Sequence, residues 1–210
     1  MIMALVDYQV EGHVARITIN RPEAKNAINP EVACRLTDAW HSVRDNAEVR
    51  VAVLTGTGDV FCAGADLGRL IPLISGSRSA EDEWDERMLA DRTILETALL
   101  REFDPIKPVI AAINGHAIAG GMEIVQGTDI RVSVPEAKFG VQEVKWAIFP
   151  AGGSTVRLPS QLPFAVAMEL LLTGDLITAD QALGFGFLNR MEKDALSIAN
   201  QIAQKIASNG

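Results

Sequence analysis

The chain has 210 residues, of which 48% are apolar, and its formal net charge at pH 7 is −8. This length and composition favour one globular domain with a sizeable core and exclude a disordered chain. So acidic a protein is a poor partner for nucleic acid or an anionic membrane, because both attract clustered lysine and arginine. We find neither a secretory signal at the start nor an apolar run long enough to span a bilayer.

The sequence contains two cysteines, Cys34 and Cys62. Two thiols are too few for a disulfide framework or a cysteine metal cluster, so we expect no bound metal. The small number of cysteines also fits a reducing compartment, and we expect a cytoplasmic protein.

The first half of the chain predicts a hairpin followed by alternating helices and strands. Alternating apolar and polar residues predict paired strands over 5–10 and 14–20. Helical spacing after Asn29, a good N-cap with Pro30 at the first helical position, predicts a helix over 30–44. We then expect a strand over 50–55, a short helix over 66–74, a loop over 76–79 and a long helix over 81–102.

The second half predicts a buried strand and then mostly helices. A continuous apolar run predicts a buried strand over 108–113, followed by a helix over 120–126 and a strand over 129–134. From residue 154 onward we expect helices, apart from a short strand at 187–189, and the last helix covers 195–207. Strands and helices that alternate before a helical tail predict an α/β domain.

Two segments have the composition of a site that binds a carbonyl oxygen. The sequence NGHAIAGGMEI, at 114–124, places two glycines at the start of a predicted helix. Free N–H groups point out of a helix start, and the helix dipole adds partial positive charge there. The sequence VFCAGADL, at 60–67, has small residues where a backbone can approach a ligand. If the N–H groups of Ala65 and Gly120 converge, they form an oxyanion hole.

Glu123 and Glu143 are candidates for proton transfer beside that oxyanion hole. An acidic residue in a first helical turn also has a purely structural explanation, because it complements the helix dipole. The apolar neighbours of Glu123 nevertheless predict burial, which raises the pKa of a carboxyl group and suits it to general acid–base catalysis. Two carboxylates near an oxyanion hole suit proton transfer next to a thioester.

Six segments, in their order and spacing, carry a family resemblance. They are ITINRPEAKNAI (17–28), FCAGADL (61–67), INGHAIAGGMEI (113–124), DIRV (129–132), KFGVQE (138–143) and TGDLITADQALGFGFLNRM (173–191). With them the chain resembles the enoyl-CoA hydratase/isomerase (crotonase) family over nearly its whole length. The resemblance implies a ClpP-like spiral of ββα units, assembly as a trimer or a dimer of trimers, and an acyl-CoA thioester as substrate without a further cofactor.

The resemblance also implies roles for individual residues. Ala65 and Gly120 match the two oxyanion amides, and Glu123 and Glu143 match the catalytic pair of the hydratase branch. In that branch both glutamates hold the attacking water, and Glu143 would supply the proton to the α-carbon. The implied enzyme is an enoyl-CoA hydratase, a hydro-lyase that converts a 2-trans-enoyl-CoA into a 3-hydroxyacyl-CoA. Residues that match the CoA-binding segments are Lys25, Ala27, Ala63, Asp66, Leu67 and Gly68.

Several alternatives stay open at this point. Lys25 could meet a CoA phosphate or be a solvated surface lysine, and Asp66 could instead cap the helix that follows it. The segment PAGGS at 150–154 is one residue shorter than the hydratase pattern, with Ala151 in the first glycine place. This departure leaves room for double-bond isomerisation, for thioester hydrolysis, or for acyl-CoA binding without catalysis.

The resemblance implies that residues 1–210 form a single crotonase-like domain. It divides the domain into a spiral core up to about residue 155 and a helical trimerisation region from about residue 156 onward. The sequence stops at SNG without the last helices usual in the family, so we expect either a truncated form or the loss of those helices. The loop over 70–83 is long and polar compared with that of typical hydratases. In the family this loop borders the acyl pocket.

Overall fold

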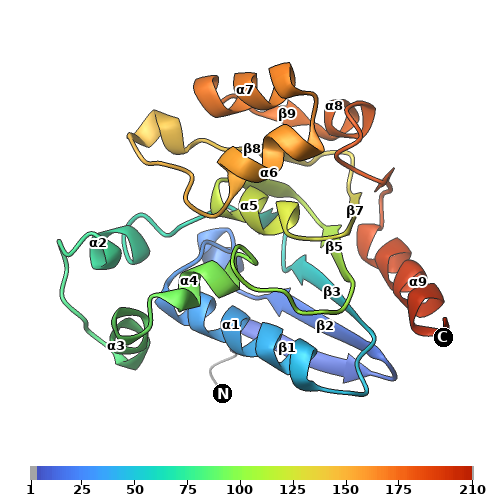
Figure 1. Cartoon of the computed structure of the whole chain (residues 1–210), viewed down its shortest axis with the longest axis horizontal. Helices are drawn as coiled ribbons and strands as arrows, with labels where there is room; N and C mark the ends of the chain where they lie inside the picture. Colours follow the sequence, from blue (N-terminus) through green and yellow to red (C-terminus); the bar gives the residue numbers. More distant parts are fainter. Residues whose placement is uncertain (1–3, 210) are drawn as a thin grey trace.

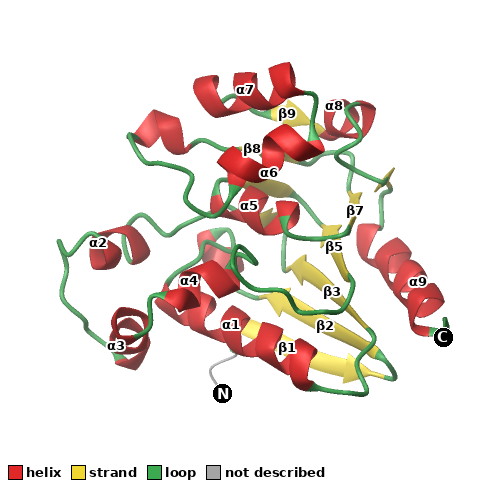
Figure 2. Ribbon diagram, in the orientation of Figure 1, coloured by secondary structure: helices red, strands yellow, loops and turns green. Residues whose placement is uncertain are grey.

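The computed structural model describes residues 4–209 and confirms the predicted α/β architecture (Figures 1 and 2). Within those residues, the larger sheet has the strand order β1-β2-β3-β5-β7-β10, and the smaller sheet has the order β4-β6-β8-β9. The β1–β2 and β8–β9 pairs are antiparallel, and the other pairs are parallel. In the same range every helix is too short or too polar to cross a membrane.

The strands of the larger sheet are β1 Val6–Glu11, β2 Val14–Ile19, β3 Val51–Gly56, β5 Val109–Ile113, β7 Ile130–Ser133 and β10 Arg190–Met191. Those of the smaller sheet are β4 Val60–Cys62, β6 His116–Ile118, β8 Lys138–Gly140 and β9 Ile177–Thr178. The α-helices are α1 Pro30–Asp45, α2 Leu70–Ile74, α3 Glu83–Ala90, α4 Thr93–Ala98, α5 Gly120–Gln126, α6 Ser154–Gln161, α7 Phe164–Thr173, α8 Ala179–Gly184 and α9 Ala195–Ala207. Two short 3-10 helices are η1 Pro22–Ala24 and η2 Glu143–Trp146.

From β3 to β8, consecutive strands alternate between the two sheets. In each of the pairs β3–β4, β5–β6 and β7–β8, the first strand joins the larger sheet and the second joins the smaller one. Helical segments follow each pair, namely α2 to α4, then α5, then η2 with α6. The chain therefore advances by one strand in both sheets with every repeat, which is the spiral of ββα units that the resemblance implies.

The central strands of the larger sheet are covered on both faces. Along β3, Val51 and Val53 pack in one cluster with Ala199 and Ala203 of α9. Ala52 and Leu54 point the other way and join the main core, which also holds Trp40 of α1 (Figure 1). This two-sided burial explains the nearly continuous apolar sequence of β3 and β5. The last helix thus packs on the sheet of the spiral core, and the division near residue 155 stays a prediction.

Strong local signals placed several elements correctly. The Asn29 side chain accepts a hydrogen bond of 2.8 Å from the N–H of Val32, which is the predicted N-cap of α1. The predicted hairpin is observed as β1 and β2, and the predicted ranges of α5 and α9 match the observed ones.

The long helix predicted over 81–102 is wrong, because the chain forms two helices, α3 and α4, instead. Asp91 between them is extended, with φ −130° and ψ 102°. Its side chain accepts bonds of 2.9 Å from the N–H of Thr93 and 2.7 Å from the Thr93 hydroxyl. Asp91 therefore competes with the helical backbone for a donor and starts a new helix.

Two other predicted boundaries are misplaced. The helix predicted from residue 66 begins only at Leu70, because the Asp66 carboxylate binds the N–H groups of Gly68 and Arg69 and closes a turn. The strand predicted at 187–189 lies slightly later, as β10. The strands β4, β6 and β8 were not predicted, since three residues are too few to show a periodic pattern.

The start of α5 lies against β4 without space for a side chain between them. A Cβ atom built on Gly121 would lie closer than 3.0 Å to the carbonyl oxygen, the carbonyl carbon and the Cβ atom of Cys62. Because two of these atoms belong to the backbone, they cannot turn away as a flexible side chain could. Glycine at this position is therefore a condition for docking α5 onto the smaller sheet.

We predict that Gly121→Ala lowers the free energy of unfolding by roughly 2–3 kcal/mol, since overpacking must move α5 or β4. Gly184→Ala is the matched control, because a Cβ atom there meets nothing within 4 Å. The control should be neutral or slightly stabilising, as alanine favours a helix over glycine. Chemical denaturation of both variants measures the difference, and equal stabilities would contradict the contact described here.

Candidate active site

A cavity of about 480 Å³ lies between the α2–α4 segment and the start of α5. It is lined by both predicted oxyanion residues, Ala65 and Gly120, and by both predicted catalytic residues, Glu123 and Glu143. Most of the remaining wall is apolar and includes Leu70, Ile71, Met88, Leu95, Leu99 and Ile118. The cavity therefore combines a small polar region with a larger apolar compartment, as ligand pockets commonly do.

The two predicted oxyanion amides lie close to each other on the wall of this cavity. Ile28 pairs in parallel with Ala65, and its own bonds go to the carbonyl of Gly64 and the N–H of Asp66. The N–H of Ala65 consequently points away from Ile28. A Cβ atom built on Gly120 would lie 3.7 Å from the Ala65 nitrogen, in ordinary van der Waals contact.

Ala119 provides the sharp turn between β6 and α5. Its φ of 51° and ψ of −126° form a combination that residues with a side chain rarely adopt. Backbone of this kind costs on the order of 1–3 kcal/mol and persists where the surrounding structure enforces it. The turn lets α5 begin directly after β6, so that Gly120 presents its N–H as the first residue of the helix.

Glu123 is buried in contact with the segment at 152–154. Only 3% of the residue is exposed, and Oε1 accepts a bond of 3.2 Å from the N–H of Ser154. Gly152 touches the same carboxylate so closely that a Cβ atom there would overlap with it. Burial raises the pKa of Glu123, while hydrogen bonds from Ser154 and Gly152 and the charge of Arg157 oppose that rise.

Glu143 is the first residue of η2 and has fewer compensating contacts. It is 9% exposed, and its buried Oε2 atom has no hydrogen-bond partner within residues 4–209. Burial, followed by the negative charge of Glu123, raises the pKa of Glu143 to about 7. A carboxyl group with that pKa can donate or accept a proton near neutral pH.

Ser154 and Gln126 support Glu123 but were not predicted from the sequence. The Gln126 side-chain amide donates a bond of 2.9 Å to the Ser154 hydroxyl, and both side chains are buried. Ser154 opens α6, so its N–H is one of the free donors of a helix start. The pair of glycines before Ser154 is the only local signal that could have indicated this contact.

The residues predicted to bind CoA fall into two groups. Ala63 and Leu67 line the cavity, whereas Lys25, Ala27, Asp66 and Gly68 do not. The two predicted segments are nevertheless joined, because the N–H of Ala63 binds the carbonyl of Lys25 at 3.1 Å. Lys25 is exposed and has a left-handed φ of 52° at the end of η1.

Asp66 does not cap α2, whose N-cap is Arg69, but holds the turn before that helix. One carboxylate oxygen binds the N–H groups of Gly68 and Arg69, at 2.9 Å each. The other oxygen pairs with Arg21 at 2.6 Å. Both oxygens of Asp66 thus have partners that hold the loop beside the cavity.

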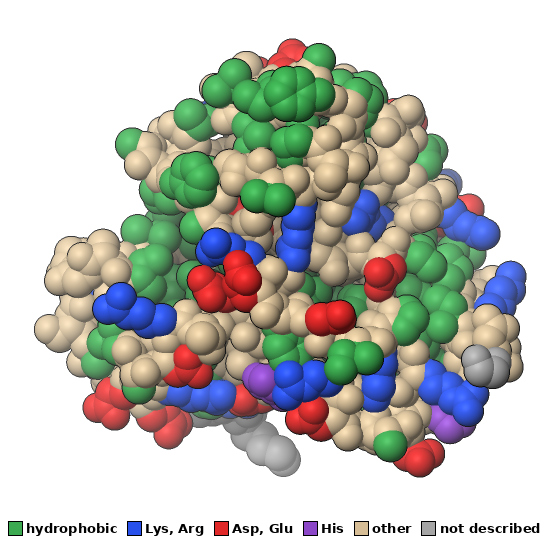
Figure 3. Space-filling model, in the orientation of Figure 1, with side chains coloured by type: hydrophobic (Ala, Val, Ile, Leu, Met, Phe, Trp, Pro, Cys, Tyr) green, Lys and Arg blue, Asp and Glu red, His purple; other side chains and the backbone are tan. Residues whose placement is uncertain are grey.

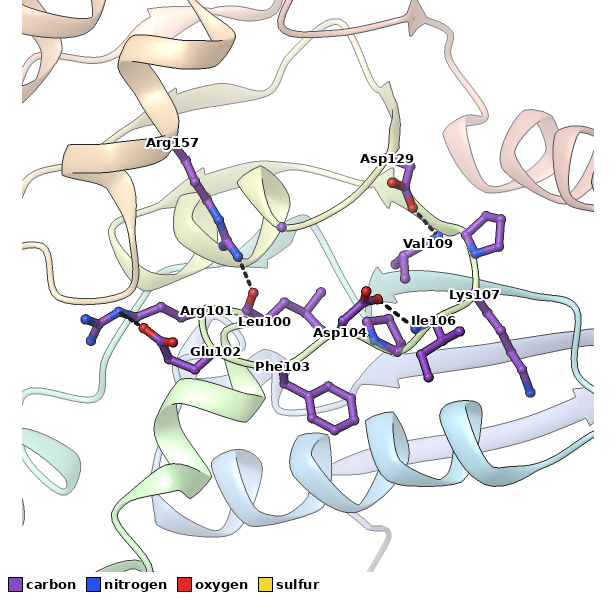
Figure 4. Close-up of a pocket in the computed structure, with 13 residues that line it drawn as sticks. Leu100, Arg101, Glu102, Phe103, Asp104, Ile106, Lys107, Val109, Asp129 and Arg157 are labelled. Atoms are coloured by element: carbon purple, nitrogen blue, oxygen red, sulfur yellow. Dashed lines mark hydrogen bonds and ion pairs between the residues drawn. The ribbon is translucent and has the colours of Figure 1, made fainter.

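A second cavity, of about 610 Å³, lies beside the loop from Leu100 to Val109 (Figure 4). Charged side chains of this cavity form hydrogen bonds with nearby backbone groups. Arg157 donates to the carbonyl of Leu100, and Asp129 accepts a bond of 2.7 Å from the N–H of Val109. In addition, no three His, Cys, Asp or Glu side chains among residues 4–209 are arranged as metal ligands.

We predict that Glu143→Gln stabilises the protein above neutral pH. The folded-state pKa of about 7 exceeds the ordinary value of 4.5, so the folded chain holds more protons between these pH values. The free energy of unfolding should therefore fall as pH rises through this window. Glutamine removes this loss, which predicts a gain of roughly 3 kcal/mol at pH 8 and none at pH 4.

Denaturation at both pH values measures this gain, with Glu192→Gln as a control on an exposed carboxylate. A gain that is the same at pH 4 and pH 8 would contradict a raised pKa for Glu143.

Comparison with known proteins places this geometry in a family. The family model described as enoyl-CoA hydratase/isomerase matches residues 9–210. An enoyl-CoA hydratase of Mycobacterium tuberculosis is 41% identical over 201 residues, which are 95% of this chain and 73% of the relative. An (E)-benzylidenesuccinyl-CoA hydratase of Thauera aromatica is 40% identical over 213 residues, covering 97% of this chain and 76% of the relative.

Solved structures give the same result. The crystal structure of an enoyl-CoA hydratase from Mycobacterium marinum superposes with a TM-score of 0.85 at 36% identity, covering 99% of this chain and 77% of the other. Family model, relatives and structure agree over nearly the whole chain, so the chain belongs to the enoyl-CoA hydratase/isomerase family.

Proposed function

We propose that this protein is an enoyl-CoA hydratase, which adds water across the 2-trans double bond of an enoyl-CoA. The observation that carries the proposal is the meeting of two buried carboxylates, Glu123 and Glu143, with the amides of Ala65 and Gly120 in one largely apolar cavity. The hydratase names of the relatives support the same reaction.

In the proposed reaction the amides of Ala65 and Gly120 hold the thioester oxygen. Negative charge develops on that oxygen when water attacks the β-carbon, and preorganised N–H donors stabilise it. Glu123, ionised and held by Ser154, takes one proton from the attacking water. Glu143, protonated, gives its proton to the α-carbon. The water oxygen ends on the β-carbon as a hydroxyl group, and return of the proton from Glu123 to Glu143 resets the site.

We further propose that Lys25, Ala27, Ala63, Asp66, Leu67 and Gly68 border the CoA part of the substrate. The bond from Ala63 to Lys25 supports this arrangement, because it fixes the two segments side by side. CoA enters only as part of the substrate, and no separate cofactor takes part. The free thiols of Cys34 and Cys62 are in keeping with a cytoplasmic enzyme.

We predict that Glu123→Gln and Glu143→Gln each lower kcat by roughly 10²–10⁴-fold, because each removes one proton-transfer group. Loss of enoyl absorbance with crotonyl-CoA measures the hydration rate. Glutamine keeps the shape of the side chain, so binding of a saturated acyl-CoA should change little.

Product analysis with a 3-enoyl-CoA and with a saturated acyl-CoA provides the control. Isomerisation or thioester hydrolysis as the only turnover would reject hydration. A hydration rate that survives Glu143→Gln would reject the proposed acid.

We also propose that the chain assembles as a homotrimer or a dimer of trimers. Large apolar side chains on α6 and α7 are exposed, with 76% exposure for Val156, 68% for Phe164 and 68% for Leu172. Hydrophobic atoms gather over these helices at the top of the view in Figure 3. Contiguous exposed apolar surface of this kind favours a protein interface.

We predict that Phe164→Asp dissociates this assembly, since it would place a charge in an apolar interface. Light scattering after size-exclusion chromatography should give the mass of three or six chains for the unmodified protein and of one chain for the variant. Gln201→Asp, which adds the same charge on an exposed position of α9, is the control. An unmodified protein that elutes as a single chain at every concentration would refute the assembly.

A further inference from the structure

Arg92 is a charged residue in the apolar part of the active-site cavity. It lies at the junction of α3 and α4, lines the cavity and is exposed. Within residues 4–209 its guanidinium makes no hydrogen bond or ion pair with another side chain. The wall near it is made by apolar side chains of α2, α3 and α4, which are Ile71, Ile74, Leu89 and Leu95.

The neighbouring charges of α4 do not neutralise Arg92. Glu96, four residues further on, pairs with Arg101 at 3.3 Å. Arg92, Glu96 and Arg101 line the cavity, so this side of it carries two positive charges and one negative charge. In the second cavity, by contrast, Arg157 donates to the backbone carbonyl of Leu100 (Figure 4), and Lys107 donates to that of Asn46. The charge of Arg92 is therefore available to a ligand in the active-site cavity.

Helix α4 gives the distance between Arg92 and the catalytic region. Leu99, at the end of this helix, lies next to the carboxylate of Glu123, because a Cβ atom on Gly152 would contact both within 3.0 Å. Arg92 stands seven residues before Leu99. A rise of 1.5 Å per residue separates them by about 10 Å along the helix axis. The acyl chain and the extended side chain of Arg92 together can bridge this span.

We propose that the cavity accepts an enoyl-CoA whose acyl chain ends in a carboxylate, and that Arg92 binds this carboxylate. A planar guanidinium matches a carboxylate with two parallel hydrogen bonds. The apolar wall between the catalytic carboxylates and Arg92 holds the methylene groups. This inference rests on the proposed function and narrows its substrate to the thioester of a dicarboxylic acid.

Binding measurements test the recognition without requiring turnover. Calorimetry compares adipoyl-CoA with hexanoyl-CoA, which has the same chain length but no carboxylate. Arg92→Gln should weaken adipoyl-CoA binding by about tenfold, the size expected for one partly solvated charged pair, and leave hexanoyl-CoA binding within about twofold. Arg190→Gln, which removes an exposed arginine of β10 outside the cavity, should leave both affinities unchanged.

Two results would overturn the proposal. Equal weakening of both ligands would mean that Arg92 contacts the CoA phosphates or supports the fold. Unchanged affinities would mean that Arg92 takes no part in recognition. Hydration of 2-hexenedioyl-CoA and 2-hexenoyl-CoA separates this inference from the proposed function. If neither is hydrated while the binding difference holds, only the hydratase proposal fails; if both are hydrated and Arg92→Gln affects neither, only the carboxylate proposal fails.

Discussion

The site depends on the contact between Gly64 and the start of α5. A Cβ atom on Gly64 would lie 2.7 Å from the Cβ atom of Ala119 and 3.1 Å from the nitrogen of Gly120. Gly64 also has a φ of 94°, which favours glycine. Any side chain there would push the loop of one spiral unit away from the helix of the next. The amides of Ala65 and Gly120 would then lie further apart.

The two carboxylates differ in what surrounds them, and this difference supports their separate roles. Glu123 receives hydrogen bonds from Ser154 and Gly152, which favour its ionised form. Glu143 has an unpartnered oxygen among the described residues and also experiences the charge of Glu123. Environments that separate the pKa values of two neighbouring acids allow one to act as base and the other as acid.

The sequence predicted best where a residue acts on its immediate neighbours in the chain. Asn29 and Pro30 identified the start of α1, and the paired glycines identified the start of α5. Prediction failed where a short side chain competes with the helix, as at Asp91. It also failed for strands of three residues, whose pairing depends on the neighbouring unit.

Contacts made only in the folded chain were likewise beyond prediction. The hydrogen bond from Ser154 to Glu123 joins residues 31 positions apart, and no periodic pattern in the sequence indicates it. Arg92 lines the cavity from the break between α3 and α4. The sequence pattern predicted one continuous helix there, so the position of Arg92 was not predicted.

The alternation of strands between two sheets has a consequence for folding kinetics. Ala65, Gly120 and Glu143 follow β4, β6 and β8, so each comes from a different turn of the spiral. Parallel pairing of distant segments gives a high contact order. Such topologies fold slowly, because the entropy of loop closure is lost before the stabilising non-local contacts form. A folding intermediate that lacks any one of these turns consequently lacks part of the proposed binding site for a thioester.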